Sequence, residues 1–153
     1  MRTPLRQGHR RRRKVYAYIT HGDRLLVFTH VDAPEAGIQV PGGSLEKGED
    51  AEAGVLREAE EETGLAGLRL AGLLGECEHP LPDLGEVHHR RYYHLTCAQA
   101  PPEIWEHREM YPSDGSAPPL FRFYWVPLPA GVPHLLGELD QMVPGLLERM
   151  GLA

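Results

Sequence analysis

Three glutamates, Glu58, Glu61 and Glu62, lie at positions i, i+3 and i+4 of one short segment. In an α-helix, which turns ~100° per residue, this spacing puts the three side chains on one face within a single turn. Like charges placed so closely destabilise a helix by roughly 0.2–0.5 kcal/mol per pair. Converging carboxylate oxygens are, however, the ligands that Mg²⁺ and Mn²⁺ prefer. The glutamates are therefore a candidate site for divalent ions that polarise a phosphate and activate a water.

A helix over residues 51–63 must carry these side chains. Asp50 is a suitable N-cap and Gly64 a suitable C-terminal stop. Apolar residues recur between them at helical spacing, namely Ala51, Val55, Leu56 and Ala59. For a glutamate run alone, a solvated acidic helix face with Arg57 paired to Glu61 is the simpler interpretation. The flanking sequence favours a functional site, because Gly42 and Gly43 permit a tight turn whose backbone approaches a ligand closely.

The segment from Gly43 to Leu65 resembles the Nudix box. That signature reads glycine, five residues, glutamate, seven residues, Arg-Glu, apolar, any, Glu-Glu, any, glycine, apolar. Every fixed position is filled at the correct spacing, by Gly43, Glu49, Arg57, Glu58, Glu61, Glu62, Gly64 and Leu65. The one departure is Ala59, where Ile, Leu or Val is more usual, and it concerns core packing rather than chemistry.

The resemblance implies an α/β fold, an α/β/α sandwich with a central mixed β-sheet. It implies metal-dependent hydrolysis of a phosphoanhydride bond in a nucleoside diphosphate linked to another moiety. Such substrates include a nucleoside triphosphate, a nucleotide sugar, ADP-ribose and a dinucleoside polyphosphate. Removal of pyrophosphate from RNA 5′ ends is an alternative. A non-catalytic nucleotide-binding sensor of the same fold is another, but such proteins usually lose box glutamates, and this chain keeps them all. A metal-dependent isomerase on the same fold is a further, weaker alternative.

Carried over residue by residue, the resemblance implies a Mg²⁺ or Mn²⁺ site. The implied ligands are Glu58, Glu61, Glu62 and a backbone carbonyl of Gly42 or Gly43. Glu58 and Glu61 are also the candidates within the box for activating the attacking water.

The box also contains residues that support this site. Arg57 belongs with the catalytic group mainly as a brace, and Glu49 and Gly64 support the loop–helix–loop. In this family the general base often lies outside the box. Three later glutamates remain open for that role, namely Glu103, Glu106 and Glu109.

Substrate contacts are predicted only weakly. Arg90 and Tyr92 lie in a strand-like run of alternating side chains that could face a phosphate, although a polar outer strand face is the simpler interpretation. Trp105 could stack on a base. It belongs to the segment 103–119, which ends in proline- and glycine-rich turn sequence, and we predict that this segment carries specificity.

Runs of β-branched and aromatic residues predict the remaining elements. Strands are expected over 15–20, 25–29, 68–78, 88–97 and 121–128. A closing helix is expected over 135–150, kinked or restarted at Pro144. Strands that flank one early helix, with a second helix at the end, predict a mixed sheet between helical layers.

Charge is distributed unevenly along the 153 residues, whose net charge is −6. The first fourteen residues hold seven basic side chains and no acid, and the remainder holds 9 basic and 22 acidic residues. We therefore predict a basic tail over residues 1–14 and a single hydrolase domain over 15–153. The tail could bind RNA, but a disordered lead-in to the first strand is the preferred interpretation. A body this acidic repels phosphate unless bound cations reverse the local field.

Composition indicates a cytoplasmic protein, and the resemblance implies a small nucleotide-like substrate. No apolar run approaches the roughly 18 residues of a membrane span, and no apolar stretch follows the basic start as in a secretory signal. Two cysteines make no disulfide framework, so a reducing compartment is expected. We expect no membrane partner, regard nucleic acid as a weaker possibility, and leave a homodimer open.

Overall fold

The structure is a computed structural model that describes residues 10–109 and 117–153. Within these ranges seven strands form one sheet, in which β4, β5, β1, β2, β7 and β6 are neighbours in that order and β3 pairs with β1. Strands β1 and β5 are parallel, and the other pairings are antiparallel. The strands are β1 (Arg10–His21), β2 (Arg24–His30), β3 (Gly42–Ser44), β4 (Leu68–Leu81), β5 (Glu86–Cys97), β6 (Ile104–Arg108) and β7 (Leu120–Pro127).

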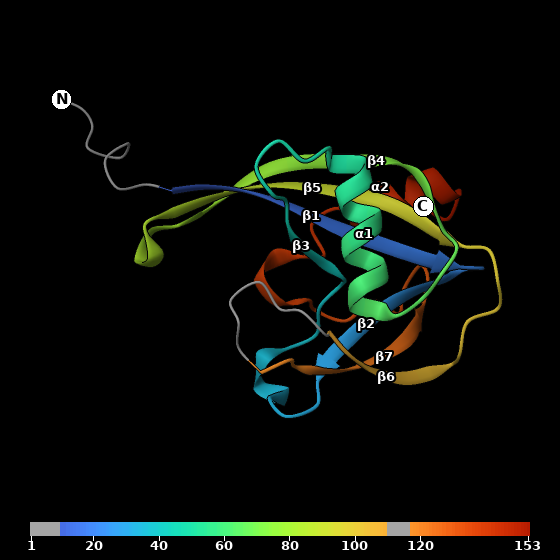
Figure 1. Cartoon of the computed structure of the whole chain (residues 1–153). Coiled ribbons are helices and arrows are strands. Elements are labelled where there is room, and N and C mark those ends of the chain that lie inside the picture. The colour runs from blue at the N-terminus through green and yellow to red at the C-terminus, as the bar shows by residue number, and fades with distance from the viewer. Residues whose placement is uncertain (1–9, 110–116) are drawn as a thin grey trace.

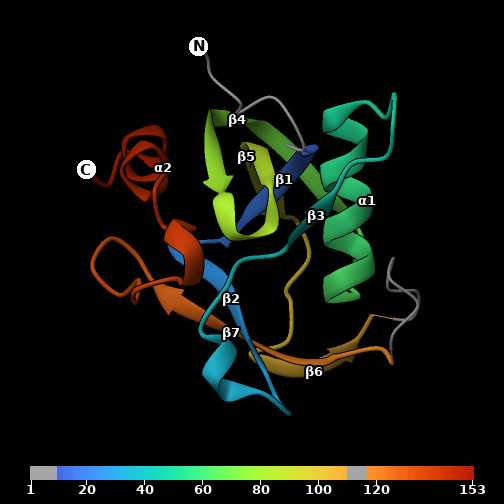
Figure 2. The same ribbon diagram turned by 90° about the vertical axis from the view of Figure 1, so that its left-hand side faces the viewer.

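Two helices cover the two faces of this sheet, α1 (Ala51–Thr63) and α2 (Val143–Met150) (Figures 1 and 2). The predicted α/β/α sandwich around a mixed sheet is thus confirmed. Alternation along β1 builds both layers, because successive side chains of a strand point to opposite faces. Ala17 packs with Val55 of α1 in one core, and Tyr18 packs with Leu146 of α2 in the other.

Strand β1 begins at Arg10, five residues before the predicted strand. It pairs with β5 without interruption from Arg10 opposite Glu86 to Thr20 opposite Thr96. The prediction of a tail through residue 14 is therefore wrong for residues 10–14, and residues 1–9 lie outside the described part. Sequence periodicity missed this extension because its side chains are charged. Carboxylates on other strands of the sheet form ion pairs with these basic side chains, for example Glu78 with Arg11 at 2.9 Å.

Helix α1 has the predicted bounds and caps. The Asp50 carboxylate accepts a hydrogen bond of 2.9 Å from the backbone N–H of Ala53. Gly64 ends the helix at φ 76°, in the left-handed region that favours glycine. Ala59 is fully buried in the core beneath the helix, so the smaller residue at this box position is accommodated by close packing against the sheet.

The second half of the chain differs from the prediction in two elements. Ile104–Arg108 forms the edge strand β6, which was not predicted and lies inside the segment 103–119 that we predict to carry specificity; residues 110–116 of that segment lie outside the described part. The closing helix does not fill the range 135–150: it restarts at Val143, with Pro144 in its first turn, where a missing N–H costs nothing, so the predicted restart at Pro144 is confirmed. Neither helix, nor any other in the described ranges, is long and apolar enough to cross a membrane.

Candidate metal and active site

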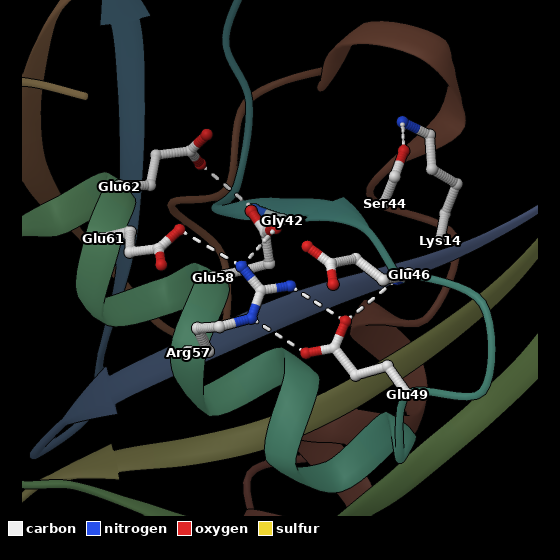
Figure 3. Close-up of polar contacts among 9 residues, drawn as sticks. All are labelled: Lys14, Gly42, Ser44, Glu46, Glu49, Arg57, Glu58, Glu61 and Glu62. Atoms are coloured by element: carbon white, nitrogen blue, oxygen red, sulfur yellow. Dashed lines mark hydrogen bonds and ion pairs between the residues drawn. The ribbon is translucent and has the colours of Figure 1, made fainter. Parts of the chain in front are cut away.

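Strand β3 brings its glycines against the glutamates of α1, and Figure 3 shows Gly42 beside Glu62. A Cβ at Gly43 would collide with the Glu58 carboxylate, and a Cβ at Gly42 would collide with the ring of Tyr16. The backbone N–H of Gly42 donates a hydrogen bond of 3.1 Å to Oε1 of Glu62. Gly43 is therefore required by the close approach of β3 to α1, and Gly42 by the close approach of β3 to β1.

Three carboxylates from two segments converge beside this contact. Ligand oxygens of Glu58, Glu61 and Glu109 all lie within 4.8 Å of one another. Glu58 and Glu61 come from α1, whereas Glu109 directly follows β6. A set of convergent carboxylate oxygens fits a hard divalent cation such as Mg²⁺ or Mn²⁺. Sequence reasoning could not choose Glu109, because the fold alone places it against the helix.

The other two late glutamates point elsewhere. Glu103 forms a bidentate pair with Arg24, with N–O distances of 2.7 and 3.1 Å, and its side chain is 73% exposed. Glu106 forms an ion pair of 2.7 Å with Arg122 across β6 and β7. Of the three candidates for a carboxylate outside the box, only Glu109 lies within the carboxylate cluster.

Glu62 lies apart from that cluster. Its side chain is buried, and burial raises its pKa well above the ordinary value, although the hydrogen bond from Gly42 opposes this shift. In this structure Glu62 fixes the start of β3 against the end of α1. Its predicted role as a metal ligand stays a prediction.

Glu58 is the most perturbed carboxylate of the cluster. Burial raises its pKa to about 7, while the neighbouring guanidinium of Arg57 lowers it and Glu61 and Glu109 raise it. Desolvation disfavours the charged form, as do two adjacent negative charges. The side chain therefore exchanges a proton near neutral pH, and a cation bound there would compete with that proton.

Arg57 of α1 connects the helix to Glu49 in the loop that precedes it. Its Nε and Nη2 donate hydrogen bonds of 2.8 and 2.9 Å to the two carboxylate oxygens of Glu49, and its Nη1 lies 3.1 Å from Glu58 and 3.2 Å from Glu61 (Figure 3). The Glu49 carboxylate raises the pKa of this guanidinium, and the guanidinium lowers the pKa of Glu49. Glu49 also accepts a hydrogen bond from the backbone N–H of Glu46, which closes the turn before α1.

Strand β6 holds the end of the helix. The indole Nε1 of Trp105 donates a hydrogen bond of 2.8 Å to the carbonyl of Thr63, and Nε2 of His107 lies 3.0 Å from the carbonyl of Glu61. Because a carbonyl only accepts, Nε2 of His107 must carry the proton of that contact. A Cβ at Gly64 would collide with the His107 ring. These contacts were missed from the sequence, where His107 alternates with Trp105 on an unrecognised strand.

The side chain of Trp105 supports the end of α1 through this hydrogen bond. Its ring stacks on Phe123 with centroids 5.2 Å apart and packs against the core beneath α1. It lines a cavity of about 320 Å³ behind the end of the helix. The ring is held by Phe123 and Thr63 and also lines this cavity, so its predicted role in stacking on a base stays a prediction.

Arg90 and Tyr92 do not reach the carboxylates. They are 5% and 0% exposed, on the face of the sheet opposite α1. The guanidinium of Arg90 donates hydrogen bonds of 2.7 Å to the carbonyl of Gly137 and 3.1 Å to the hydroxyl of Tyr92. It also lies over the ring of Tyr16, 5.4 Å from the centroid. The prediction that these two residues contact substrate is corrected, because sequence alternation shows that side chains share a face but not whether that face is buried.

Lys14, which the sequence assigned to the basic tail, lies on β1 near the site. Its Nζ donates a hydrogen bond of 2.9 Å to Oγ of Ser44, and burial, followed by the charge of Arg12, lowers its pKa. It lines a cavity of about 150 Å³ together with Gly43 and Glu62. The aromatic rings of Tyr16, Phe28 and Phe121 also line this cavity. A positive group thus lies beside the glycines that meet the glutamates.

Comparison with known domains decides the family. Residues 10–139 match the NUDIX domain. The chain belongs to the Nudix family. The matched region begins where β1 begins, so the basic run at Arg10 is part of the Nudix domain rather than a tail before it.

Solved structures share the Nudix fold at low sequence identity. A MutT NUDIX hydrolase from Burkholderia pseudomallei is 22% identical, with a TM-score of 0.64 over 90% of this chain and 98% of its own. A UDP-X diphosphatase is 16% identical, with a TM-score of 0.64 over 93% of this chain and 64% of its own. A bifunctional NMN adenylyltransferase/ADP ribose pyrophosphatase from Francisella tularensis, complexed with AMP and a Mn ion, is 19% identical. Its TM-score is 0.53, over 91% of this chain and 42% of its own. No curated protein sequence matches the chain significantly.

Family membership and the complete box make this Nudix protein a pyrophosphohydrolase that depends on a divalent metal. The structural neighbours, all below 25% identity, support the fold alone.

Proposed function

We propose that this Nudix enzyme hydrolyses a phosphoanhydride bond in a nucleoside diphosphate linked to another moiety, with Mg²⁺ or Mn²⁺ held by Glu58, Glu61 and Glu109. The observation that carries the proposal is the convergence of these three carboxylates within 4.8 Å. Two fold neighbours are named as a UDP-X diphosphatase and an ADP ribose pyrophosphatase, which agrees with a nucleotide diphosphate as the core of the substrate. Nucleoside triphosphates, nucleotide sugars, ADP-ribose and dinucleoside polyphosphates all contain that core.

The reaction is attack of a water on one phosphorus, with departure of the other phosphate. A divalent ion held by Glu58, Glu61 and Glu109 would neutralise charge on the phosphate oxygens and lower the pKa of the water. Glu109 lies in this cluster and comes from outside the box, where the general base of this family often lies, so we assign it the role of orienting the water and accepting its proton. Arg57 keeps Glu58 and Glu61 in position, because its guanidinium lies within 3.2 Å of both. Catalysis in such a site comes mainly from positioning and electrostatics.

Lys14 supplies positive charge on the strand side of the site. Its ammonium group is held by Ser44 at 2.9 Å, in the chain immediately after Gly43. A phosphate beside Gly43 would therefore lie between the ammonium group of Lys14 and the carboxylate of Glu58. We propose that Lys14 stabilises the negative charge that develops on the departing phosphate.

The test combines a substrate panel with metal titration. Nucleoside triphosphates, nucleotide sugars, ADP-ribose and dinucleoside polyphosphates are incubated with Mg²⁺ and Mn²⁺ separately, and released monophosphate, phosphate and pyrophosphate are measured. Mn²⁺ affinity is measured by calorimetry on the wild type and on Glu58→Gln, Glu61→Gln and Glu109→Gln. Each variant should weaken Mn²⁺ binding about tenfold or more and lower turnover by roughly 10²-fold or more, since each removes a charged ligand.

Glu103→Gln and Glu106→Gln are the matched controls, because each removes the same charge from a carboxylate paired elsewhere. Both should retain wild-type metal affinity and turnover. Unchanged Mn²⁺ affinity in all three cluster variants would refute the metal site. Tight nucleotide binding with no turnover of any substrate would instead support the sensor alternative.

A further inference from the structure

The cavity of about 320 Å³ beside the C-terminal end of α1 is separate from the proposed active site. Strands β4 and β5 pair as far as Leu68 opposite Cys97, and beyond that pair the connections to α1 and to β6 diverge at the same end of the sheet (Figure 1). Both connections and two side chains of β6 line the cavity, namely residues 63–66, 97, 99–102, 105 and 107. None of these residues belongs to the carboxylate cluster or lines the cavity that contains Lys14.

Aromatic and proline rings form much of the wall of this cavity. Trp105, Pro101 and Pro102 line it, and the ring of Trp125 lies beside that of Trp105, with centroids 6.3 Å apart. The indole Nε1 of Trp125 donates a hydrogen bond of 2.9 Å to the carbonyl of Pro102, which holds this part of the wall in place. Gln99 adds an amide that can both donate and accept. Apolar walls with a few polar groups are typical of small-molecule sites, whose volumes are roughly 300–1,000 Å³.

The lining offers no charged partner for a phosphate. All of its residues belong to the described ranges, and none of them is an aspartate, glutamate, lysine or arginine. Thr63 and Gly64 line the cavity, so the carbonyl end of α1, which carries partial negative charge, borders it. Heteroaromatic rings such as nucleobases stack on aromatic side chains and form hydrogen bonds through their edges. The cavity therefore fits an uncharged heteroaromatic ring rather than a phosphorylated ligand.

Two residues of the cavity also hold the end of the helix that bears the proposed metal ligands. Trp105 donates a hydrogen bond of 2.8 Å to the carbonyl of Thr63. Nε2 of His107 lies 3.0 Å from the carbonyl of Glu61, and Glu109 follows His107 by two residues. A ring that packs on the two side chains from β6 would therefore stabilise the contacts that position Glu61 and Glu109.

We propose that this cavity binds a nucleoside, separately from the substrate, and that its occupation strengthens binding of the divalent ion at the carboxylate cluster. The inference rests on the proposed function for the metal site, but nucleoside binding itself is independent of turnover. Coupling between two sites is reciprocal, so the metal must strengthen nucleoside binding by the same factor.

Intrinsic fluorescence reports this binding, because the chain's two tryptophans are Trp105 and Trp125. Adenosine, guanosine, cytidine and uridine are titrated separately into the full chain, with and without saturating Mg²⁺. At least one nucleoside should change the fluorescence saturably, and Mg²⁺ should lower its dissociation constant about fivefold or more. Calorimetry with Mn²⁺ should show a comparable gain in metal affinity when that nucleoside is bound.

Variants that fill the cavity locate the bound nucleoside. Ala100→Phe places a ring in the cavity, and Ala66→Phe does so from the opposite connection, which covers a failure of the first variant to fold. Ala98→Phe is the matched control, because Ala98 is exposed on the same connection as Ala100 and does not line the cavity. Each filled variant should weaken nucleoside binding about tenfold or more by steric exclusion and remove its effect on metal affinity. Ala98→Phe should retain both, and thermal unfolding shows whether each variant is folded.

Four results would contradict the inference. The absence of saturable binding by any of the nucleosides would overturn it, as would binding that both filled variants retain. Unchanged metal affinity with the nucleoside bound would overturn the coupling. Competitive inhibition of turnover that is lost in Ala100→Phe would show instead that the cavity holds the base of the substrate. Coupled binding in a protein that hydrolyses no substrate would leave this inference standing and reject the proposed function, whereas turnover without any effect of nucleosides would do the reverse.

Discussion

The indole Nε1 of Trp105 donates a hydrogen bond of 2.8 Å to the backbone carbonyl of Thr63, the last residue of α1. The last four carbonyls of a helix have no partner within the helix, so an external donor there fixes the final turn. The final turn of α1 contains Glu61 and Glu62. The edge strand β6 thus positions the glutamates of the box from behind, through backbone atoms.

We expect Trp105→Phe to weaken metal binding without changing substrate preference. A phenyl ring retains the stacking on Phe123 but loses the donor to Thr63, a loss of about 1 kcal/mol. Mn²⁺ affinity should fall severalfold, and the ratio of kcat/KM between two nucleotides should stay constant. Trp105→Ala should in addition lower the free energy of unfolding by about 3 kcal/mol. A rise in KM for nucleotides of one base only, with metal affinity unchanged, would show instead that Trp105 contacts the substrate.

Gly43→Ala tests the close approach of β3 to the helix. The added Cβ would overlap the Glu58 carboxylate, so the side chain must rotate or the strand must move. We expect turnover to fall by roughly 10²-fold, the loss associated with a displacement of about 1 Å at a reacting centre. Gly48→Ala is a useful comparison, because nothing lies within 4 Å of its Cβ position, although its φ of 76° makes that variant strained as well. A Gly43→Ala enzyme with wild-type kcat would show that Glu58 does not act from its observed position.

The pH dependence of metal binding follows from Glu58, whose pKa is raised from 4.5 to about 7. Only the carboxylate form binds a cation, so Mn²⁺ affinity should fall as the pH drops below about 7, and binding should release close to one proton at about pH 6. Calorimetry in buffers of different ionisation enthalpy measures that release. In the metal-free protein the raised pKa stabilises the fold below pH 4.5, and this contribution is lost as the pH rises through about 7. Glu58→Gln should remove both effects, and their persistence would assign the proton to another group.

The helix and its chemistry were predictable from the sequence because their determinants are local. The Asp50 cap, the Gly64 stop and the i, i+3, i+4 spacing of the glutamates all lie within one segment. The strand at Arg10 was not predictable, because its side chains are satisfied by carboxylates 67 and 74 residues away. Periodicity detects apolar faces, and a charged strand has none.

Long-range placement also accounts for the errors at the site. Glu103, Glu106 and Glu109 are equivalent in the sequence, and only the course of β6 brings Glu109 to the helix and the other two to Arg24 and Arg122. In the same way, the alternating run that contains Arg90 gave the correct strand, but the packing of α2 determines which face is buried.

The fork between Arg57 and Glu49 allows a prediction about geometry rather than charge. Two hydrogen bonds, of 2.8 and 2.9 Å, join the guanidinium to the carboxylate, while a third nitrogen faces Glu58 and Glu61. Arg57→Lys keeps the charge but cannot span both partners, since an ammonium group is a single point of contact. We therefore expect Arg57→Lys to lower kcat by roughly tenfold or more while lowering the free energy of unfolding by only about 1 kcal/mol, because the pair is partly exposed. Glu49→Gln leaves one acceptor oxygen and should lower kcat less.

A double-mutant cycle between Arg57 and Glu49, with kcat and thermal unfolding measured in parallel, tests the coupling. Strictly additive effects on kcat would show that Arg57 acts on the glutamates without help from Glu49.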